Sequence, residues 1–460
     1  MTESAKPPLA SDATTALGTA PLGRLLWHTC SQTTLSVGVY GFYALTNAWF
    51  VAHGVGADAM AAVNLAAPVL LVMGAVSTTV GAGGASLVSR RLGAGDPAGA
   101  ARAAGNAFAI YWLIAIAVTV SGLIALDPLL GVLGAGAGTS DYSRDYLVVL
   151  LCGTLTYTGF SSLVRAEGRQ RYATALWVVA VVVQIILDPL LIYGFDLGVR
   201  GAALGTVGGQ TVSALMSLWF FFGQSTRPYR VGVRDLLPRL AVLRELIGIG
   251  APSFLAGLGA TLLVVLVNRA LATATVALAA YAVCARIQTF ITMPQMGISQ
   301  GIQPIVGYNA GRGLSERVLR VRTLALRATL GYGVLASAVL ILLADPLTRI
   351  FVEEPEVALE SAQVLRILAV GIAVAGVVPL TSAYFQSLGH LRPAYVISVG
   401  TLLIIKLPLV LALAVLGEVG VWFSLAAGEL LSACVALLAI SRLYTVTGRS
   451  ETSTIRPPRS

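Results

Sequence analysis

One carboxylate, Asp188, lies inside a mainly apolar stretch that runs from Ala173 to Tyr193. A run of this length can form a membrane-spanning helix. An acid within such a helix costs about 2.5–3.5 kcal/mol on membrane-insertion scales, so it is rarely kept without a use. We therefore expect Asp188 to be an ion, proton or substrate site. The alternative is a water-exposed residue at the outer interface, just before Pro189.

Three other polar residues are expected at the depth of Asp188. Gln184 precedes it by one helical turn and lies on the same helix face. Counting 1.5 Å per residue from the ends of the predicted helices places Asn47 and Thr206 in the same outer third. A carboxylate among amide and hydroxyl oxygens could hold Na⁺ or a proton. The alternative is a hydrogen-bonded cluster that only packs the helices together.

Two opposite charges form a second candidate site, near the middle of the membrane. Lys406 is about twelve residues into the predicted helix at 394–416, and Glu429 is about nine residues into the one at 420–441. Unpaired charges at this depth are costly, so we expect an intramembrane ion pair between them. The pair is either purely structural or opens and closes with a transport cycle.

Composition predicts an all-α membrane protein. The 460 residues are 57% hydrophobic and only 11% charged, with a mean hydropathy of +0.83, whereas soluble proteins are about one quarter charged. The sequence has no phosphate-binding loop, no Cys-x-x-Cys and no cluster of its three histidines. We therefore expect no enzyme activity, no catalytic residue, no cofactor and no metal. The net charge of +9 comes mainly from arginines between apolar runs, which gives no reason to expect a nucleic-acid partner.

The apolar runs predict twelve transmembrane helices in two sets of six. The expected regions are a disordered cytoplasmic tail at 1–22, an N-lobe at 23–223, a cytoplasmic linker at 224–244, a C-lobe at 245–445 and a cytoplasmic tail at 446–460. Basic residues concentrate in the tails and alternate loops, so both termini are expected in the cytoplasm and the protein in the cell membrane.

The two halves repeat short motifs in the same order at offsets of 218 to 221 residues. An even number of helices per half gives both halves the same orientation, so we expect a pseudo-two-fold parallel repeat of two six-helix bundles. This architecture favours a carrier that works by alternating access. The repeated pairs are Asp127/Asp345, Pro189/Pro408, Gly198/Gly417, Gly168/Gly389 and Asn47/Asn268.

Five segments resemble the multidrug and toxic compound extrusion (MATE) family, and within it the branch named for DNA-damage-inducible protein F. The resemblance implies a monomeric antiporter of the MOP superfamily, in which H⁺ or Na⁺ enters while a small amphiphilic or cationic compound leaves. It also implies that the N-lobe coupling site maps onto Asn47, Gln184, Asp188 and Thr206. The segments are Gly81–Asp96, Arg165–Gly168, Ile186–Thr206, Met293–Gly311 and Phe385–Gly389.

Three positions depart from the family pattern. Asn47 replaces an acid, Gln184 replaces an asparagine, and Ala260 stands about where another branch has a C-lobe acid. Asp188 is then the only carboxylate of its group and cannot share a proton with a second one. The coupling ion stays open, as do two other functions: a flippase for lipid-linked precursors or secondary metabolites, and a non-transporting membrane receptor or scaffold.

Overall fold

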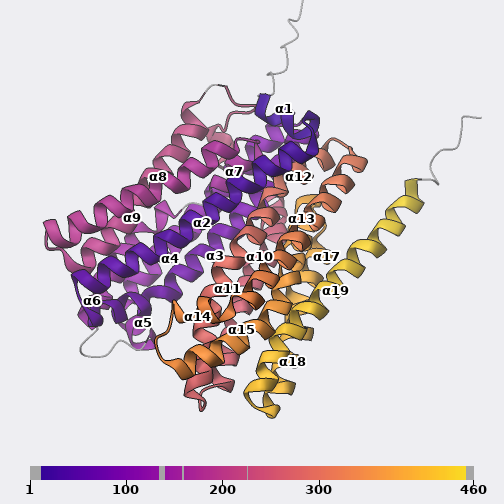
Figure 1. Cartoon of the computed structure of the whole chain (residues 1–460). Helices are drawn as coiled ribbons and strands as arrows, with labels where there is room; N and C mark the ends of the chain where they lie inside the picture. Colours follow the sequence, from indigo (N-terminus) through magenta and orange to yellow (C-terminus); the bar gives the residue numbers. More distant parts are fainter. Residues whose placement is uncertain (1–11, 134–139, 158–159, 225, 452–460) are drawn as a thin grey trace, which may run out of the picture. The chain divides into compact units, whose positions relative to one another are not determined.

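The computed structural model describes residues 12–133, 140–157, 160–224 and 226–451, which are mostly helical and contain no β-strand in these ranges (Figure 1). The first half contains α1 (Asp12–Thr19), α2 (Leu22–Gly54), α3 (Ala57–Gly93), α4 (Pro97–Ile124), α5 (Leu126–Leu133), α6 (Ser140–Gly153), η1 (Thr154–Thr156), α7 (Phe160–Ala166), α8 (Gln170–Pro189), η2 (Leu190–Gly194), α9 (Gly198–Leu218), η3 (Trp219–Gly223) and η4 (Val233–Asp235). The second half contains α10 (Leu240–Ala270), α11 (Thr275–Gly301), α12 (Gln303–Gly311), α13 (Ser315–Leu342), α14 (Ala344–Arg349), α15 (Pro355–Ala375), α16 (Val377–Leu388), α17 (Leu391–Tyr395), η5 (Val396–Gly400), η6 (Leu402–Lys406), α18 (Leu407–Leu413), η7 (Ala414–Leu416) and α19 (Glu418–Glu451).

Ten helical segments of the described residues are long and apolar enough to cross a membrane. The two remaining predicted spans coincide with α2 and with α9 continued by η3. The ten segments are Val63–Gly93, Pro97–Ile124, Ser140–Ala166, Gln170–Gly194, Leu240–Ala270, Thr275–Gly311, Ser315–Leu342, Pro355–Leu388, Leu391–Leu416 and Glu418–Arg442.

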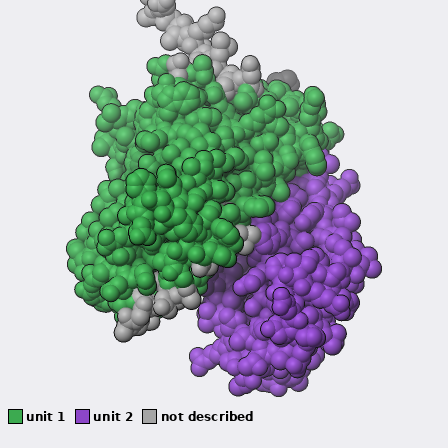
Figure 2. Space-filling view, turned by 60° about the vertical axis from the view of Figure 1, so that its left-hand side comes forward, with its two compact units in different colours: residues 1–254, 301–321, 386–389 green, residues 255–300, 322–385, 390–460 purple. Residues whose placement is uncertain are grey.

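The chain divides into two compact units, coloured separately in Figure 2. Unit 1 comprises residues 1–254, 301–321 and 386–389; unit 2 comprises 255–300, 322–385 and 390–460. Each unit has its own apolar core. The core of unit 1 gathers aromatic side chains such as Phe108 and Phe160, and the core of unit 2 is built around aliphatic side chains and Trp422.

Glycines with positive φ occur in matching pairs in the two halves of the sequence. Gly168 (φ 85°) corresponds to Gly389 (φ 75°), and Gly198 (φ 51°) corresponds to Gly417 (φ 78°). Only glycine adopts this left-handed conformation without strain, so these positions fix where helices end or begin. The repeat seen in the sequence motifs is therefore also a repeat of backbone conformation.

An ion pair is repeated as well. Asp127, at the start of α5, pairs with Arg144 of α6, and Asp345, at the start of α14, pairs with Arg366 of α15. Both pairs tie a short helix to the longer helix that follows it. All four side chains are substantially exposed, so each pair contributes little to stability, about 0–1 kcal/mol.

The N-terminal segment does not match its prediction in full. We expected a disordered tail over residues 1–22, and this is wrong for Asp12–Thr19, which form α1. Thr14 and Leu17 are each only 1% exposed, and Thr14 Oγ1 donates to the Glu167 carbonyl over 2.7 Å. The prediction failed because α1 is too short to show a convincing apolar period. Residues 1–11 and 452–460 of the predicted tails lie outside the described residues.

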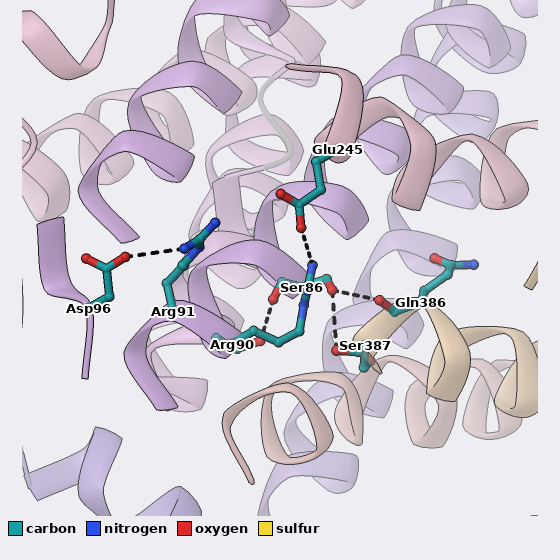
Figure 3. A network of polar contacts seen from close by, with 8 residues as sticks. Ser86, Arg90, Arg91, Asp96, Glu245, Gln386 and Ser387 are labelled. Carbon is teal, nitrogen blue, oxygen red and sulfur yellow. Dashed lines mark hydrogen bonds and ion pairs between the residues drawn. The ribbon is translucent and has the colours of Figure 1, made fainter. Parts of the chain in front are cut away.

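The C-terminal end of α3 holds several segments of unit 1 through polar contacts (Figure 3). Ser86 Oγ donates to the carbonyls of Gln386 and Ser387, over 2.7 and 3.4 Å. Arg90 pairs with Glu245 of α10 over 3.1 Å. The buried hydroxyl of Ser86 thus ties residues about 300 positions away in the sequence to this helix end, and the ion pair ties α10 to it.

The glycine-rich motif of α3, at 81–96, permits very close backbone packing against α10. A β-carbon at Gly83 would lie 2.0 Å from the Leu246 carbonyl oxygen, a distance that no side chain can occupy. Small residues at helix contacts are a usual means of close packing in membranes, where the hydrophobic effect does not drive helices together. This motif therefore serves helix packing within unit 1.

Candidate functional site

Three helices of unit 1 bring the four residues of the predicted N-lobe site together. Asn47 lies on α2, Gln184 and Asp188 lie on α8, and Thr206 lies on α9. All four side chains are buried, with between 0% and 6% of their surface exposed. The water-exposed alternative for Asp188 is therefore wrong, because its side chain has no exposed surface.

Hydrogen bonds connect the four side chains in series. Gln184 Nε2 donates to Asp188 Oδ2 over 3.1 Å and lies 3.5 Å from Thr206 Oγ1. Asn47 Nδ2 donates to the same hydroxyl over 3.0 Å. The hydroxyl of Thr206 thus joins Asn47 of α2 to Gln184 of α8, and Gln184 in turn contacts Asp188.

One oxygen of Asp188 is held without a donor. Its Oδ1 atom has no hydrogen-bond partner among the described residues and packs against α9 at Gly205. A β-carbon at Gly205 would lie 2.0 Å from this oxygen, so the carboxylate occupies space that only glycine leaves open. A buried carboxylate oxygen with no donor has the capacity to take a proton or a cation.

The backbone beside Asp188 is irregular. Asp188 occupies the last turn of α8, where Pro189 lacks an amide hydrogen and cannot continue the normal helical bonding. The chain continues as η2, a π-helical turn from Leu190 to Gly194. Single π-turns within helices are frequent at functional sites, and broken helices in transporters supply polar backbone near bound ions.

The site has the chemistry of a small monovalent cation or proton site. The amide nitrogens of Asn47 and Gln184 donate to the hydroxyl of Thr206 and the carboxylate of Asp188, so Asp188 Oδ1 is the oxygen of the four-residue cluster that can take a proton or a cation. No group of three or more His, Cys, Asp or Glu residues that could hold a metal ion occurs in the described parts of the chain.

The predicted ion pair of the second half is present within unit 2. Lys406 Nζ lies 2.5 Å from Glu429 Oε1, and 18% and 25% of the two side chains are exposed. Lys406 is the last residue of η6, and Glu429 lies on α19. Depth counting thus identified two charges that are in contact.

A third charged pair escaped the sequence analysis. Glu167 and Arg227 form an ion pair in which both side chains are almost completely buried. The guanidinium lies within 4.9 Å of the ring centres of Phe220, Phe221 and Tyr229, and its Nη1 donates to the Phe221 carbonyl over 2.8 Å. The only signal was the Arg-Ala-Glu-Gly motif, which we noted without a partner for its acid.

This pair anchors the start of the predicted linker, 224–244, to unit 1. Arg227, Tyr229 and Val231 are each less than a tenth exposed, and Tyr229 and Val231 belong to the core of unit 1. Burial, and next the charge of Glu167, raise the pKa of Tyr229 well above its usual value. This part of the linker is thus part of the folded unit.

Comparison with known proteins gives consistent matches over nearly the whole chain. A family model described as MatE matches residues 34–190 and 252–411. The two matched stretches begin 218 residues apart, which agrees with the offsets of 218 to 221 between the repeated motifs. A multidrug export protein MepA of Staphylococcus haemolyticus is 26% identical over 87% of this chain and 89% of its own length. One from Staphylococcus aureus is 25% identical over 92% and 94%.

Solved structures have the same fold. A crystal structure of MATE in the bent conformation matches with a TM-score of 0.89, covering 96% of this chain and 100% of its own at 23% identity. A MOP superfamily transporter from Pyrococcus furiosus matches with a TM-score of 0.87, covering 95% and 99% at 23% identity. These matches confirm the predicted fold of twelve helices in two bundles.

Proposed function

This chain belongs to the MatE family, and we propose that it is a secondary active exporter of small amphiphilic or cationic organic compounds. The family assignment confirms the prediction from the sequence motifs, while the DNA-damage-inducible branch stays a prediction. Members of the family are transporters and not enzymes. The proposed export activity is supported by the relatives named as multidrug export proteins.

We further propose that export is coupled to H⁺ or Na⁺ at Asp188. The observation that carries this proposal is the buried carboxylate, bonded through Oδ2 to Gln184 and held with Oδ1 against Gly205. The ionised carboxylate of Asp188 is costly in this buried position when no ion is bound. A bound cation or proton neutralises the charge and removes that cost. In this proposal the cost differs between the conformations of the carrier, so that occupancy of the site shifts the equilibrium between them, which is the requirement for coupling.

The hydrogen-bonded series gives ion occupancy a route to other helices. An ion or proton at Asp188 changes the hydrogen bond that Gln184 Nε2 donates to the carboxylate. Gln184 also contacts the Thr206 hydroxyl, which Asn47 shares, so the hydrogen bonds of Thr206 change as well. Three helices are thereby made sensitive to one charge. Asn47 acts in this proposal as a positioning residue and not as a second acid.

The orientation and assembly are proposals too. We place both termini in the cytoplasm, on the basis of the arginine-rich segments, and expect a monomer in the membrane. The duplicated backbone conformations support the proposal of alternating access through a parallel repeat.

The decisive experiment measures transport by the purified protein in liposomes, with a pH gradient and a Na⁺ gradient imposed separately. We expect uptake of a lipophilic cation such as ethidium to be driven by one of the two gradients. Asp188→Asn, which keeps the size of the side chain, should abolish gradient-driven transport. The matched control is Asp145→Asn, which removes a carboxylate from an exposed ion pair with Arg200 in the same unit.

Two results would contradict the proposal. Full transport by Asp188→Asn under both gradients would remove the coupling role from this residue while leaving export intact. Absence of ethidium transport by the wild-type protein under every gradient would contradict the proposed export itself.

A further inference from the structure

Glu429 faces the interior of unit 2. Its neighbours at helical spacing on α19, Trp422, Ala426 and Ala433, are buried, whereas Phe423 and Leu430 on the opposite stripe are exposed. Positions three or four apart share one face of a helix, so Glu429 belongs to the buried stripe. Its carboxylate is therefore directed into the helix bundle and not toward lipid.

The Lys406–Glu429 pair differs from the sealed pair of unit 1. Glu167 and Arg227 are 0% and 1% exposed, and the arginine is held by a carbonyl and three aromatic rings besides the carboxylate. Lys406 and Glu429 keep 18% and 25% of their side-chain surface exposed and are joined by the contact between Nζ and Oε1. Lysine carries a compact charge on a flexible four-carbon stem, so this pair can separate without breaking a fork of hydrogen bonds.

In the sequence repeat, the pair also lies close to the positions equivalent to the Asp188 site. Pro408 corresponds to Pro189 at an offset of 219, which places Lys406 next to the equivalent of Asp188. Glu429 corresponds to Gln210, one helical turn after Thr206. Each half has a π-helical turn near this proline: η2 begins directly after Pro189, and η6 ends two residues before Pro408. The second half thus carries an ammonium group one position before Leu407, the residue equivalent to Asp188, and a carboxylate at the position of Gln210.

We propose that Glu429 is a binding site for lipophilic cations and that the ammonium group of Lys406 occupies it when no such compound is bound. The proposal rests on the proposed export function and names a substrate-binding group for it. A carboxylate inside the bundle needs a positive partner, which Lys406 supplies. An incoming organic cation offers the same charge with additional apolar surface.

Competition by a tethered cation has a measurable consequence. While Lys406 occupies Glu429, only the fraction of molecules with the pair open can bind a substrate cation, which lowers its apparent affinity. The flexible stem lets the displaced ammonium move toward a more polar region. Anions and uncharged compounds gain nothing from this exchange, so the site selects for positive charge.

The test measures equilibrium binding of radiolabelled tetraphenylphosphonium to the full-length protein in lipid nanodiscs. Lys406→Gln should bind this cation about tenfold more tightly, because the internal competitor is gone. Glu429→Gln should bind it about tenfold more weakly, and the double variant should resemble Glu429→Gln. Tetraphenylborate, an anion of the same shape, should show no gain in affinity with Lys406→Gln.

Arg366→Gln is the matched control, because it removes an exposed ion pair from the same unit. It should leave tetraphenylphosphonium binding unchanged. Thermal unfolding of each variant separates binding from stability: a purely structural pair predicts lower melting temperatures for both single variants and recovery in the double variant, with unchanged affinity.

Unchanged or weaker tetraphenylphosphonium binding by Lys406→Gln would overturn this inference. If the wild-type protein still exports ethidium under an ion gradient, the proposed function stands without it. If the wild-type protein neither binds tetraphenylphosphonium nor transports ethidium, both proposals fail together.

Discussion

Asp188 Oδ1 lies directly against the backbone of Gly205, where a β-carbon would come within 2.0 Å of it. The carboxylate and the glycine therefore depend on each other, although they lie on different helices. Gly205 leaves the space in which Asp188 can hold an oxygen free of donors, and this space is the centre of the proposed coupling site.

Gly205→Ala should impair coupling, because the added methyl group must displace the carboxylate or separate α8 from α9. We expect gradient-driven transport to fall at least about tenfold in liposomes, which corresponds to about 1.4 kcal/mol. Gly208→Ala on the same helix is the control, since its β-carbon would meet only the end of the Leu187 side chain. Normal transport by Gly205→Ala would mean that the close contact has no role in coupling.

Thr206→Val should leave two buried amide groups without their shared hydroxyl. Removing one partner of a buried hydrogen bond costs about 1–3 kcal/mol, so the melting temperature should fall. Thr206→Ser keeps the hydroxyl and should retain most of the stability. Thr211→Val, which removes a hydroxyl bonded only to its own helix, is the control. Equal melting temperatures for Thr206→Val and the wild type would contradict the role of this hydroxyl as a shared acceptor.

Arg227→Ala should destabilise unit 1 severely, because it leaves the Glu167 carboxylate buried without its partner. Breaking a buried pair in this way typically costs about 3–5 kcal/mol. Arg227→Lys should recover only part of the loss, since lysine cannot form the fork or stack on the rings in the same way. The exposed Arg230→Ala is the control, and thermal unfolding is the measurement. A small effect of Arg227→Ala would show that the linker is not anchored by this pair.

The contribution of Tyr229 to the stability of the protein should be lost at high pH. Its pKa is raised in the folded state, so the unfolded chain releases the phenol proton first. The stabilising contribution is complete below the unfolded pKa of about 10 and is lost as the pH rises toward the folded value. Tyr229→Phe should therefore show a flatter decline of melting temperature between about pH 9 and pH 11. Identical pH profiles for the two proteins would contradict this assignment.

Much of the fold follows from sequence patterns that act over long segments. Apolar runs of about twenty residues and the repeated Asp-Pro and Gly-x-x-Gly motifs are sufficient to predict two bundles of helices. The grouping of Asn47, Gln184, Asp188 and Thr206 could also be predicted, because helical rise converts sequence position into depth. Their hydrogen bonds could not, since these depend on the rotation of each helix about its axis.

The features that were missed are short or depend on distant partners. α1 has only eight residues, and its stability comes from contacts with segments such as Glu167 that lie far away in the sequence. The Glu167–Arg227 pair joins two polar residues from segments that both looked like loops. Gly205 was part of a noted motif, but nothing in that motif shows that its missing side chain makes room for an acid.

The matching glycine conformations of the two halves have a consequence for how such a carrier can diversify. Gene duplication followed by divergence can alter the charges at equivalent positions, as with Gln210 in the first half and Glu429 in the second, while the glycine turns of the two halves stay the same. New selectivity can then arise by exchanging a few side chains on an inherited backbone, without redesigning its architecture.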